Sequence, residues 1–229
     1  MISELNILNC FQHLVDYKSD KLVLVGSGDD AAVIKSQLKD LVHSVDISKI
    51  NTHFPEDSDP KNIAYRSVAV ALSDLAAMGA YPSFISIGLT SNSNDLEWYK
   101  KFTSGLETIL NEYQIKLIGG DVTFGEVSVC VNVFGYAYDK IVLRSNAKIG
   151  DLIYITGPLG EGRQGLIDWK NNKKSSYIEN FFNPKIPFNK SKYISQFASS
   201  CIDISDGLMK DLGSICKLSE VGAEIVYEN

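Results

Sequence analysis

The spacing of apolar residues changes several times along the first 140 positions, and each change predicts a different element. Residues 3–16 carry leucine, isoleucine, phenylalanine and valine near helical spacing, with Ser3 available as an N-cap. Residues 62–80 predict a long alanine-rich helix that Gly79 closes as its C-cap. A third helix, amphipathic, is predicted over residues 95–112.

Short runs of β-branched and other apolar residues between these helices predict strands. The run 127–137 alternates valines with smaller side chains and is the clearest strand of the chain. Further strands are predicted over residues 22–25, 41–46, 83–89 and 115–120. The first unit of the chain is therefore predicted to mix helices with strands.

A charged connector over residues 138–150 indicates a domain boundary. We expect a first domain over residues 1–145 and a second over residues 146–229. The second begins with a strand predicted at 151–156, and a new strand pattern forms in its last residues, "AEIVYEN". Because an unpaired terminal strand would be an exposed edge, we interpret the second unit as an incomplete domain.

Composition narrows the function classes. Hydrophobic residues make up 45% and charged residues 22%, as in ordinary soluble globular proteins, and the net charge is −6. An acidic chain whose densest basic run is "KNNKKSS" is not expected to bind nucleic acid. Four cysteines without CxxC spacing do not favour zinc and fit a reducing, cytosolic compartment. No apolar run approaches the roughly 20 residues of a membrane span, and the N-terminus is not typical of a signal peptide.

Two glycine-rich stretches match patterns of nucleotide-binding loops. The stretch "GSGDDA" at 26–31 fits G-x-G-x-x-A, but Asp29 and Asp30 would repel a pyrophosphate, and the helix after them would be short. A dinucleotide fold is therefore disfavoured. The stretch "GEGRQG" at 160–165 is either a tight turn whose glycines let backbones pass closely or a phosphate contact, and the sequence leaves both open.

Several aspartates follow glycines or apolar runs, where single carboxylates usually form caps or turns. Asp206, for example, could simply N-cap a helix that begins near Gly207. Asp74 resists this interpretation because a carboxylate in so apolar a helix needs a strong partner or a raised pKa. Asp203 resists it because strand alternation over 202–205 would place it opposite two isoleucines. Carboxylates at the ends of different elements could together hold Mg²⁺, which usually bridges to substrate phosphates.

Six motifs, taken together, carry a specific resemblance. In chain order they are "GSGDDAAVI", "SVDIS" followed by "HF", "AVALSDLAAMGA", "IGGDVT", "LRSNAKIGDLIYITGPLG" and "IDISDGLMKDLG". Together they resemble the thiamine-monophosphate kinases, in the superfamily of aminoimidazole ribonucleotide synthetase and selenophosphate synthetase. The resemblance extends from about residue 20 to the end of the chain. It departs at Val122, where the family usually has threonine, in the polar residues before His53, and in the absence of a later acidic segment.

The resemblance implies an α+β protein, with an N-terminal α/β domain that dimerises through a mixed sheet and a second, incomplete α/β domain. It implies ATP-dependent phosphorylation of thiamine monophosphate to thiamine diphosphate with several Mg²⁺ ions. Composition, charge and hydropathy add the expectation of a cytoplasmic protein with no nucleic-acid or membrane partner. The implied metal ligands are Asp29, Ser44, the backbone of Val45, Asp46, Asp74, Asp121, Asp203 and Asp206. The implied ATP contacts are Gly120, Asp121, Arg144 and Ser205, and the implied substrate contact is His53.

The implied reaction agrees with the residues available. An acceptor phosphate with a second pKa of about 6 is largely ionised at neutral pH, so no general base is needed. Catalysis then consists of positioning two anionic groups and screening their repulsion, with Arg144 as a charge stabiliser. Two alternatives remain: an inactive nucleotide-binding or dimerisation module, and another ATP-using member of the superfamily. Selenophosphate synthetase is disfavoured because the "GSGDD" loop holds no cysteine nucleophile.

Overall fold

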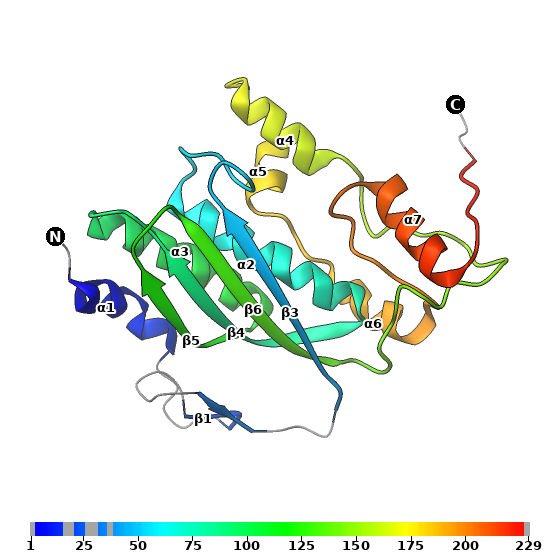
Figure 1. Ribbon diagram of the computed structural model, residues 1–229, viewed down its shortest axis with the longest axis horizontal. Coiled ribbons are helices and arrows are strands. Elements are labelled where there is room, and N and C mark those ends of the chain that lie inside the picture. The colour runs from blue at the N-terminus through cyan, green and yellow to red at the C-terminus, as the bar shows by residue number, and fades with distance from the viewer. Residues whose placement is uncertain (1–2, 16–20, 26–31, 36–38, 227–229) are drawn as a thin grey trace.

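A computed structural model of the chain describes residues 3–15, 21–25, 32–35 and 39–226. These residues form seven helices and six strands (Figure 1). The helices are α1 (Glu4–Val15), α2 (Pro60–Ala77), α3 (Leu96–Tyr113), α4 (Glu161–Lys170), α5 (Tyr177–Phe182), α6 (Phe188–Phe197) and α7 (Leu208–Ser219). The strands are β1 (Val23–Val25), β2 (Val33–Ile34), β3 (Leu41–Lys49), β4 (Ala80–Thr90), β5 (Lys116–Thr123) and β6 (Ser128–Ala137).

A four-stranded mixed sheet, in the order β3-β6-β4-β5, forms the centre of the molecule. β6 pairs antiparallel with both β3 and β4, whereas β4 and β5 are parallel. Parallel neighbours need a crossover, which α3 provides between β4 and β5. β1 and β2 form a separate antiparallel pair. The mixed sheet implied by the resemblance is therefore confirmed.

Helices α2 and α3 cover one face of this sheet and bury a common core with it (Figure 1). The alanines of α2 allow a close approach, and a Cβ built on Gly105 of α3 would lie 2.1 Å from the carbonyl oxygen of Lys61. The fully buried side chains at this layer include Val68, Leu72, Leu75, Ile85, Leu89, Phe102, Leu106, Ile109, Val129 and Val131. This packing fixes α2, the helix that carries Asp74.

The elements of the first unit lie close to their predicted positions. α2 begins two residues earlier than predicted because the side chain of Asp59 N-caps it, accepting a hydrogen bond of 2.9 Å from the Lys61 N–H. Gly79 follows the C-cap residue, Met78, and has a left-handed φ of 71°. β3 is longer than predicted and extends to Lys49.

The second half returns to the first through α5 and α6. Phe188 belongs to the core cluster, and the buried Ser191 hydroxyl donates to the carbonyl oxygen of Ala76 at 2.8 Å. Ser195 donates through Oγ to the carbonyl oxygen of Lys140 at 2.8 Å. A Cβ on Gly79 would lie 2.9 Å from the Cβ of Ser195, so the glycine serves this contact as well as the helix end.

The strands predicted in the second half are wrong. Residues 151–156 and 202–205 have no strand structure, and neither have residues 223–226, the described part of "AEIVYEN", although α4 and α7 form near them. None of the described strands pairs with them, and a strand requires a backbone partner for its N–H and C=O groups. The apolar side chains consequently face solvent, with Leu152 76% exposed and Val226 73% exposed.

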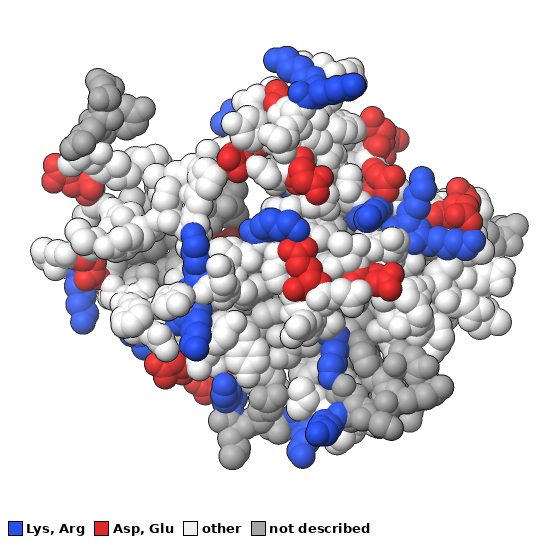
Figure 2. Space-filling view, turned by 180° about the vertical axis from the view of Figure 1, so that it is seen from behind, with Lys and Arg blue, Asp and Glu red and all other residues white. Residues whose placement is uncertain are grey.

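The surface carries both signs of charge. Acidic and basic side chains are interspersed on the face turned away from the viewer of Figure 1, without a broad basic area (Figure 2). No helix among the described residues is long and apolar enough to cross a membrane. All four cysteines are unpaired and half-buried.

Candidate functional site

Asp74 has the strong partner that its apolar helix requires. The hydroxyl of Ser44, on β3, donates to Oδ2 of Asp74 at 2.5 Å. Both side chains are half-buried, where β3 and α2 face each other. The structure thus brings together two residues that lie 30 positions apart in the sequence, both implied as metal ligands.

Asp203 approaches the same part of α2 from the second half. Its Oδ2 accepts a hydrogen bond of 3.1 Å from the Ser73 hydroxyl, and its Oδ1 lies 3.8 Å from Nη2 of Arg144. Burial raises the pKa of Asp203, and the charge of Asp74 acts in the same direction. Asp74 and Asp203 are therefore close enough to repel each other when both are ionised.

Asp46 lies on β3, two residues after Ser44, and His53 lies in the turn that follows this strand. Asp46 is half-buried and pairs in register with Val131 of β6. His53 is exposed, and its Nδ1 accepts a hydrogen bond of 3.0 Å from the N–H of Lys49, which orients the ring. Arg66 of α2 lies beside both, since its Nε–H donates to the His53 carbonyl oxygen at 3.2 Å. Burial lowers the pKa of Arg66 to about 10, and the nearby charge of Asp46 partly opposes this shift.

Gly120 and Asp121 lie together on β5, and both are exposed. A Cβ at Gly120 would lie 2.2 Å from the carbonyl oxygen of Ile87, so strand packing by itself requires glycine there. Oδ1 of Asp121 accepts a hydrogen bond of 2.9 Å from the neighbouring Val122 N–H. Among the described residues, no hydrogen bond or ion pair connects Asp121 with Asp74 or Asp203.

Ser205 and Asp206 lie in the loop before α7, where Asp211 organises the backbone. Asp211 is buried, and its Oδ2 accepts the N–H groups of Ser205, Asp206 and Gly207 at 3.0 to 3.1 Å. The N-cap residue is Gly207, so the interpretation of Asp206 as the N-cap is wrong. The carboxylate of Asp206 pairs instead with Lys210 in the first turn of the helix.

The remaining predicted residues take less part in this geometry. Val45 is on β3 with a half-exposed side chain, which leaves only its backbone for the implied role. Asp29, with the rest of the "GSGDDA" loop, lies outside the described residues. The helix that a dinucleotide fold would need after that loop is not formed at Val33–Ile34, which is the short strand β2.

Two of the three glycines of the "GEGRQG" stretch have a structural explanation, one in its backbone conformation and one in packing. Gly160 has a left-handed φ of 84° and stands at the N-terminus of α4. A Cβ on Gly165 would lie 1.9 Å from the carbonyl oxygen of Tyr177, at the contact between α4 and α5. The tight-turn interpretation therefore accounts for both glycines.

The donor set can be tested against Mg²⁺, the ion implied by the resemblance. Asp74, Asp203 and Ser44 supply oxygen ligands, the type that Mg²⁺ prefers. The negative charges of Asp74 and Asp203 repel each other, and a divalent cation bound between them would neutralise this repulsion. These residues fit the ion, although no three His, Cys, Asp or Glu residues in the described part of the chain converge closely enough to form a ready-made site.

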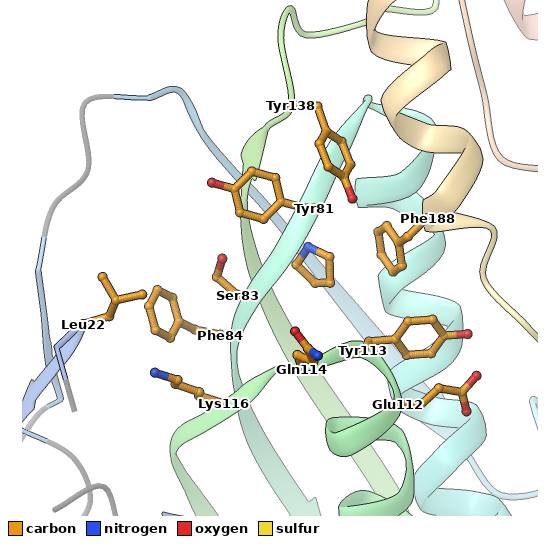
Figure 3. Close-up of a pocket in the computed structure, with 11 residues that line it drawn as sticks. Leu22, Tyr81, Ser83, Phe84, Glu112, Tyr113, Gln114, Lys116, Tyr138 and Phe188 are labelled. Atoms are coloured by element: carbon orange, nitrogen blue, oxygen red, sulfur yellow. The ribbon is translucent and has the colours of Figure 1, made fainter. Parts of the chain in front are cut away.

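A pocket of about 540 Å³ lies elsewhere, at the start of β4 (Figure 3). The rings of Tyr81, Tyr138 and Phe188 line it together with polar residues such as Gln114 (Figure 3). It contains none of the predicted site residues, so the candidate site is defined by its side chains and not by this pocket.

Three residues beside the predicted acids were missed by sequence reasoning: Ser73, Arg66 and Asp211. Ser73 immediately precedes Asp74, and only the approach of residue 203 gives it a role. An arginine in an apolar helix was a signal that could have pointed to Arg66. An acid in the first turn of α7 could likewise have pointed to Asp211.

Comparisons with known proteins place this chain in a family. A family described as "AIR synthase related protein, N-terminal domain" matches residues 28–137. A thiamine-monophosphate kinase of Buchnera aphidicola subsp. Schizaphis graminum is 43% identical over 217 residues, covering 91% of this chain and 67% of that protein. The chain therefore spans about two thirds of the length of this relative.

Solved structures agree in fold. The crystal structure of a thiamine-monophosphate kinase from Stenotrophomonas maltophilia K279a superposes with a TM-score of 0.84 at 29% identity, covering 96% of this chain and 73% of that one. A structure of AaThiL complexed with AMPPCP and TMP has a TM-score of 0.76 at 24% identity, covering 88% of this chain and 66% of that one. The second likeness shows the fold alone.

Proposed function

The chain belongs to the thiamine-monophosphate kinase family, and we propose from this that it takes part in the ATP-dependent phosphorylation of thiamine monophosphate to thiamine diphosphate. The observation that carries the proposal is the convergence of Ser44, Asp74, Asp203 and Arg144 from four separate segments. Partly burying such a group of charged and polar side chains beside an apolar helix costs free energy of folding. A functional role explains this cost more readily than a role in stability. The thiamine-monophosphate kinase of Buchnera aphidicola, 43% identical to this chain, supports the same reaction.

The residues of this chain would position the substrate phosphates and neutralise their charge, and they would not transfer protons. The acceptor phosphate is already ionised near neutral pH, because its second pKa is about 6. Arg144 is half-exposed and points a guanidinium nitrogen toward Asp203, from where it can stabilise charge on a transferring phosphoryl group. His53 would contact thiamine monophosphate, and Gly120, Asp121 and Ser205 would contact ATP.

Asp74, Asp203 and Ser44 would hold Mg²⁺, with the backbone of Val45 and the carboxylates of Asp29, Asp46, Asp121 and Asp206 as further ligands. When bound, Mg²⁺ neutralises phosphate oxygens and fixes their orientation. Ser44 and Ser73 contribute by holding the two carboxylates in place through hydrogen bonds of 2.5 and 3.1 Å. The opposite face of α2 is buried in the core, so the helix holds Ser73 and Asp74 in fixed positions.

We also propose that the reaction takes place in the cytoplasm and that the chain forms a homodimer. Four unpaired cysteines suit a reducing compartment. The sheet face opposite α2 and α3 exposes apolar side chains on edge strand β3, with Val45 49% and Ile47 55% exposed. Such a face and edge favour pairing with a second copy.

The test is formation of thiamine diphosphate by the purified chain with ATP, Mg²⁺ and thiamine monophosphate. We expect product, and we expect Asp74→Asn to reduce the rate by roughly 100-fold or more while the fold survives. Asp139→Asn is the matched control, since it removes one negative charge from an exposed side chain outside the site. Mg²⁺-dependent ATP binding without product would favour the inactive nucleotide-binding module, and absence of both would contradict the proposal.

A further inference from the structure

A partly buried arginine connects the turn that carries His53 with the second half of the chain. Arg66 lies on α2, and its Nε–H donates to the carbonyl oxygen of His53 at 3.2 Å. Its Nη1–H donates to the carbonyl oxygen of Phe181 in α5. The guanidinium carbon also lies 4.0 Å from the centroid of the Phe181 ring. Figure 1 shows α5 beside the loop that follows β3. One side chain thus holds two segments that are 128 residues apart.

The environment of Arg66 makes these contacts strong. Burial lowers the pKa of its guanidinium to about 10, and the charge of Asp46 acts in the opposite direction. The group therefore stays charged at neutral pH, and its hydrogen bonds to the two carbonyl oxygens are charge-assisted. A planar guanidinium can serve two carbonyls and a ring face together, which a lysine ammonium cannot do with the same geometry.

The turn is closed by its own hydrogen bonds, and the buried ring of Phe54 packs its end into the core. The N–H groups of Asn51 and His53 donate to the carbonyl oxygens of Phe54 and Lys49, each at 2.8 Å. The N–H of Lys49 in turn donates to Nδ1 of His53 and orients the ring. These bonds lie within the turn, whereas the bond from Arg66 connects His53 with α2. The buried Phe54 fixes the end of the turn, and the bond from Arg66 holds the backbone of the exposed His53 against α2.

We propose that Arg66 is a positioning residue for the acceptor side of the site. It fixes the His53 turn against α2 and α5, so that the imidazole is presented to thiamine monophosphate. This inference rests on the proposed function. The side-chain hydrogen bonds of Arg66 go to His53 and Phe181 and not to the residues assigned to ATP on β5 or around 144 and 205, so we expect its effect mainly on the acceptor side.

The test compares the wild-type chain with Arg66→Met and Arg66→Lys. Methionine keeps the length and apolar packing of the side chain, and lysine keeps its charge. We expect both variants to raise the KM for thiamine monophosphate about tenfold, with a less than about twofold change in the KM for ATP. We also expect faster hydrogen exchange in residues 49–54 of both variants, measured by mass spectrometry.

Asn183→Ala is the matched control, because it removes another polar contact between the end of α5 and α2 without touching the turn. Asn183 donates to Oδ1 of Asn62 at 3.4 Å. We expect it to leave exchange in residues 49–54 and both KM values unchanged. Unchanged exchange in Arg66→Met, an equal rise in both KM values, or the same effects in Asn183→Ala would overturn the role of Arg66. A wild-type chain that makes no thiamine diphosphate would contradict the proposed function instead, while the exchange measurement would still decide whether Arg66 anchors the turn.

Discussion

The contact between α2 and α3 can be tested at a single glycine, Gly105. A Cβ at this position would lie 2.1 Å from the carbonyl oxygen of Lys61 and 2.9 Å from its Cα, both backbone atoms. Ordinary contact begins near 3.4 Å, so the two helices would have to separate by roughly 1 Å. Because both helices are buried against the sheet, this separation would disturb the whole layer.

Two opposing effects decide the magnitude for Gly105→Ala. Overpacking that moves backbone typically costs about 1–3 kcal/mol, whereas alanine gains up to about 1 kcal/mol in helix propensity over glycine. We expect a net loss of about 1–2 kcal/mol in the free energy of unfolding. For a chain of this size each kcal/mol shifts the melting temperature by about 2–4 °C. Thermal and urea denaturation, followed by circular dichroism, measure both quantities.

Gly213→Ala is the matched control, since Gly213 is exposed within α7 and its Cβ position meets no described atom within 4 Å beyond its chain neighbours and the backbone of its own helix. Here only the gain in helix propensity operates, so we expect unchanged or slightly higher stability. A Gly105→Ala variant as stable as the wild type would refute the close approach of the helices. Equal losses in both variants would show that the contact with Lys61 is not the cause.

Three further predictions concern an ion pair, a helix start and an interface. Burial raises the pKa of Glu112, but hydrogen bonds from Lys185 and Tyr65 outweigh it and leave that pKa lowered. Because the pKa of Glu112 is lower in the folded state, its ionised carboxylate stabilises the protein at pH values above the unfolded pKa of about 4.3. This stabilisation is lost as the pH falls through the folded pKa. Glu112→Gln should therefore cost at most about 1 kcal/mol at pH 7 and nothing in strong acid. Urea titrations at both pH values would check this, and an equal difference at the two would argue against it. Asp211→Asn should destabilise the start of α7 by about 1–3 kcal/mol, seen as faster amide exchange at residues 205–207, since it weakens three hydrogen bonds. Ile47→Asp should yield a monomer in sedimentation analysis, with Leu5→Asp on exposed α1 as the control, and a persistent dimer would exclude the β3 face as the interface.

The first unit could be predicted closely because local periodicity coincides with tertiary burial there. The alternating valines of β6 point every second side chain into the core, and the alanines of α2 suit a helix buried beside α3. The capping residues Ser3 and Asp95 act on their own helices and need no distant partner. In such segments the sequence pattern alone determines the element.

The second half shows where local pattern fails. "DLIYIT" has the composition of a strand, yet residues 151–156 have no strand structure because no backbone in the described chain pairs with them. The start of α7 likewise depends on Asp211, which reaches back to three N–H groups, and not on the adjacent Asp206.

The candidate site divides in the same way. The sequence by itself determined which acids are present and, through the resemblance, which of them to examine. Only the tertiary structure showed the hydrogen bonds from Ser44 to Asp74, from Ser73 to Asp203 and from Arg66 to both His53 and Phe181. The physical reason is that helix and strand periods depend on neighbours a few residues away, whereas these hydrogen bonds join residues from 13 to 130 positions apart and form only once the sheet and helices have packed.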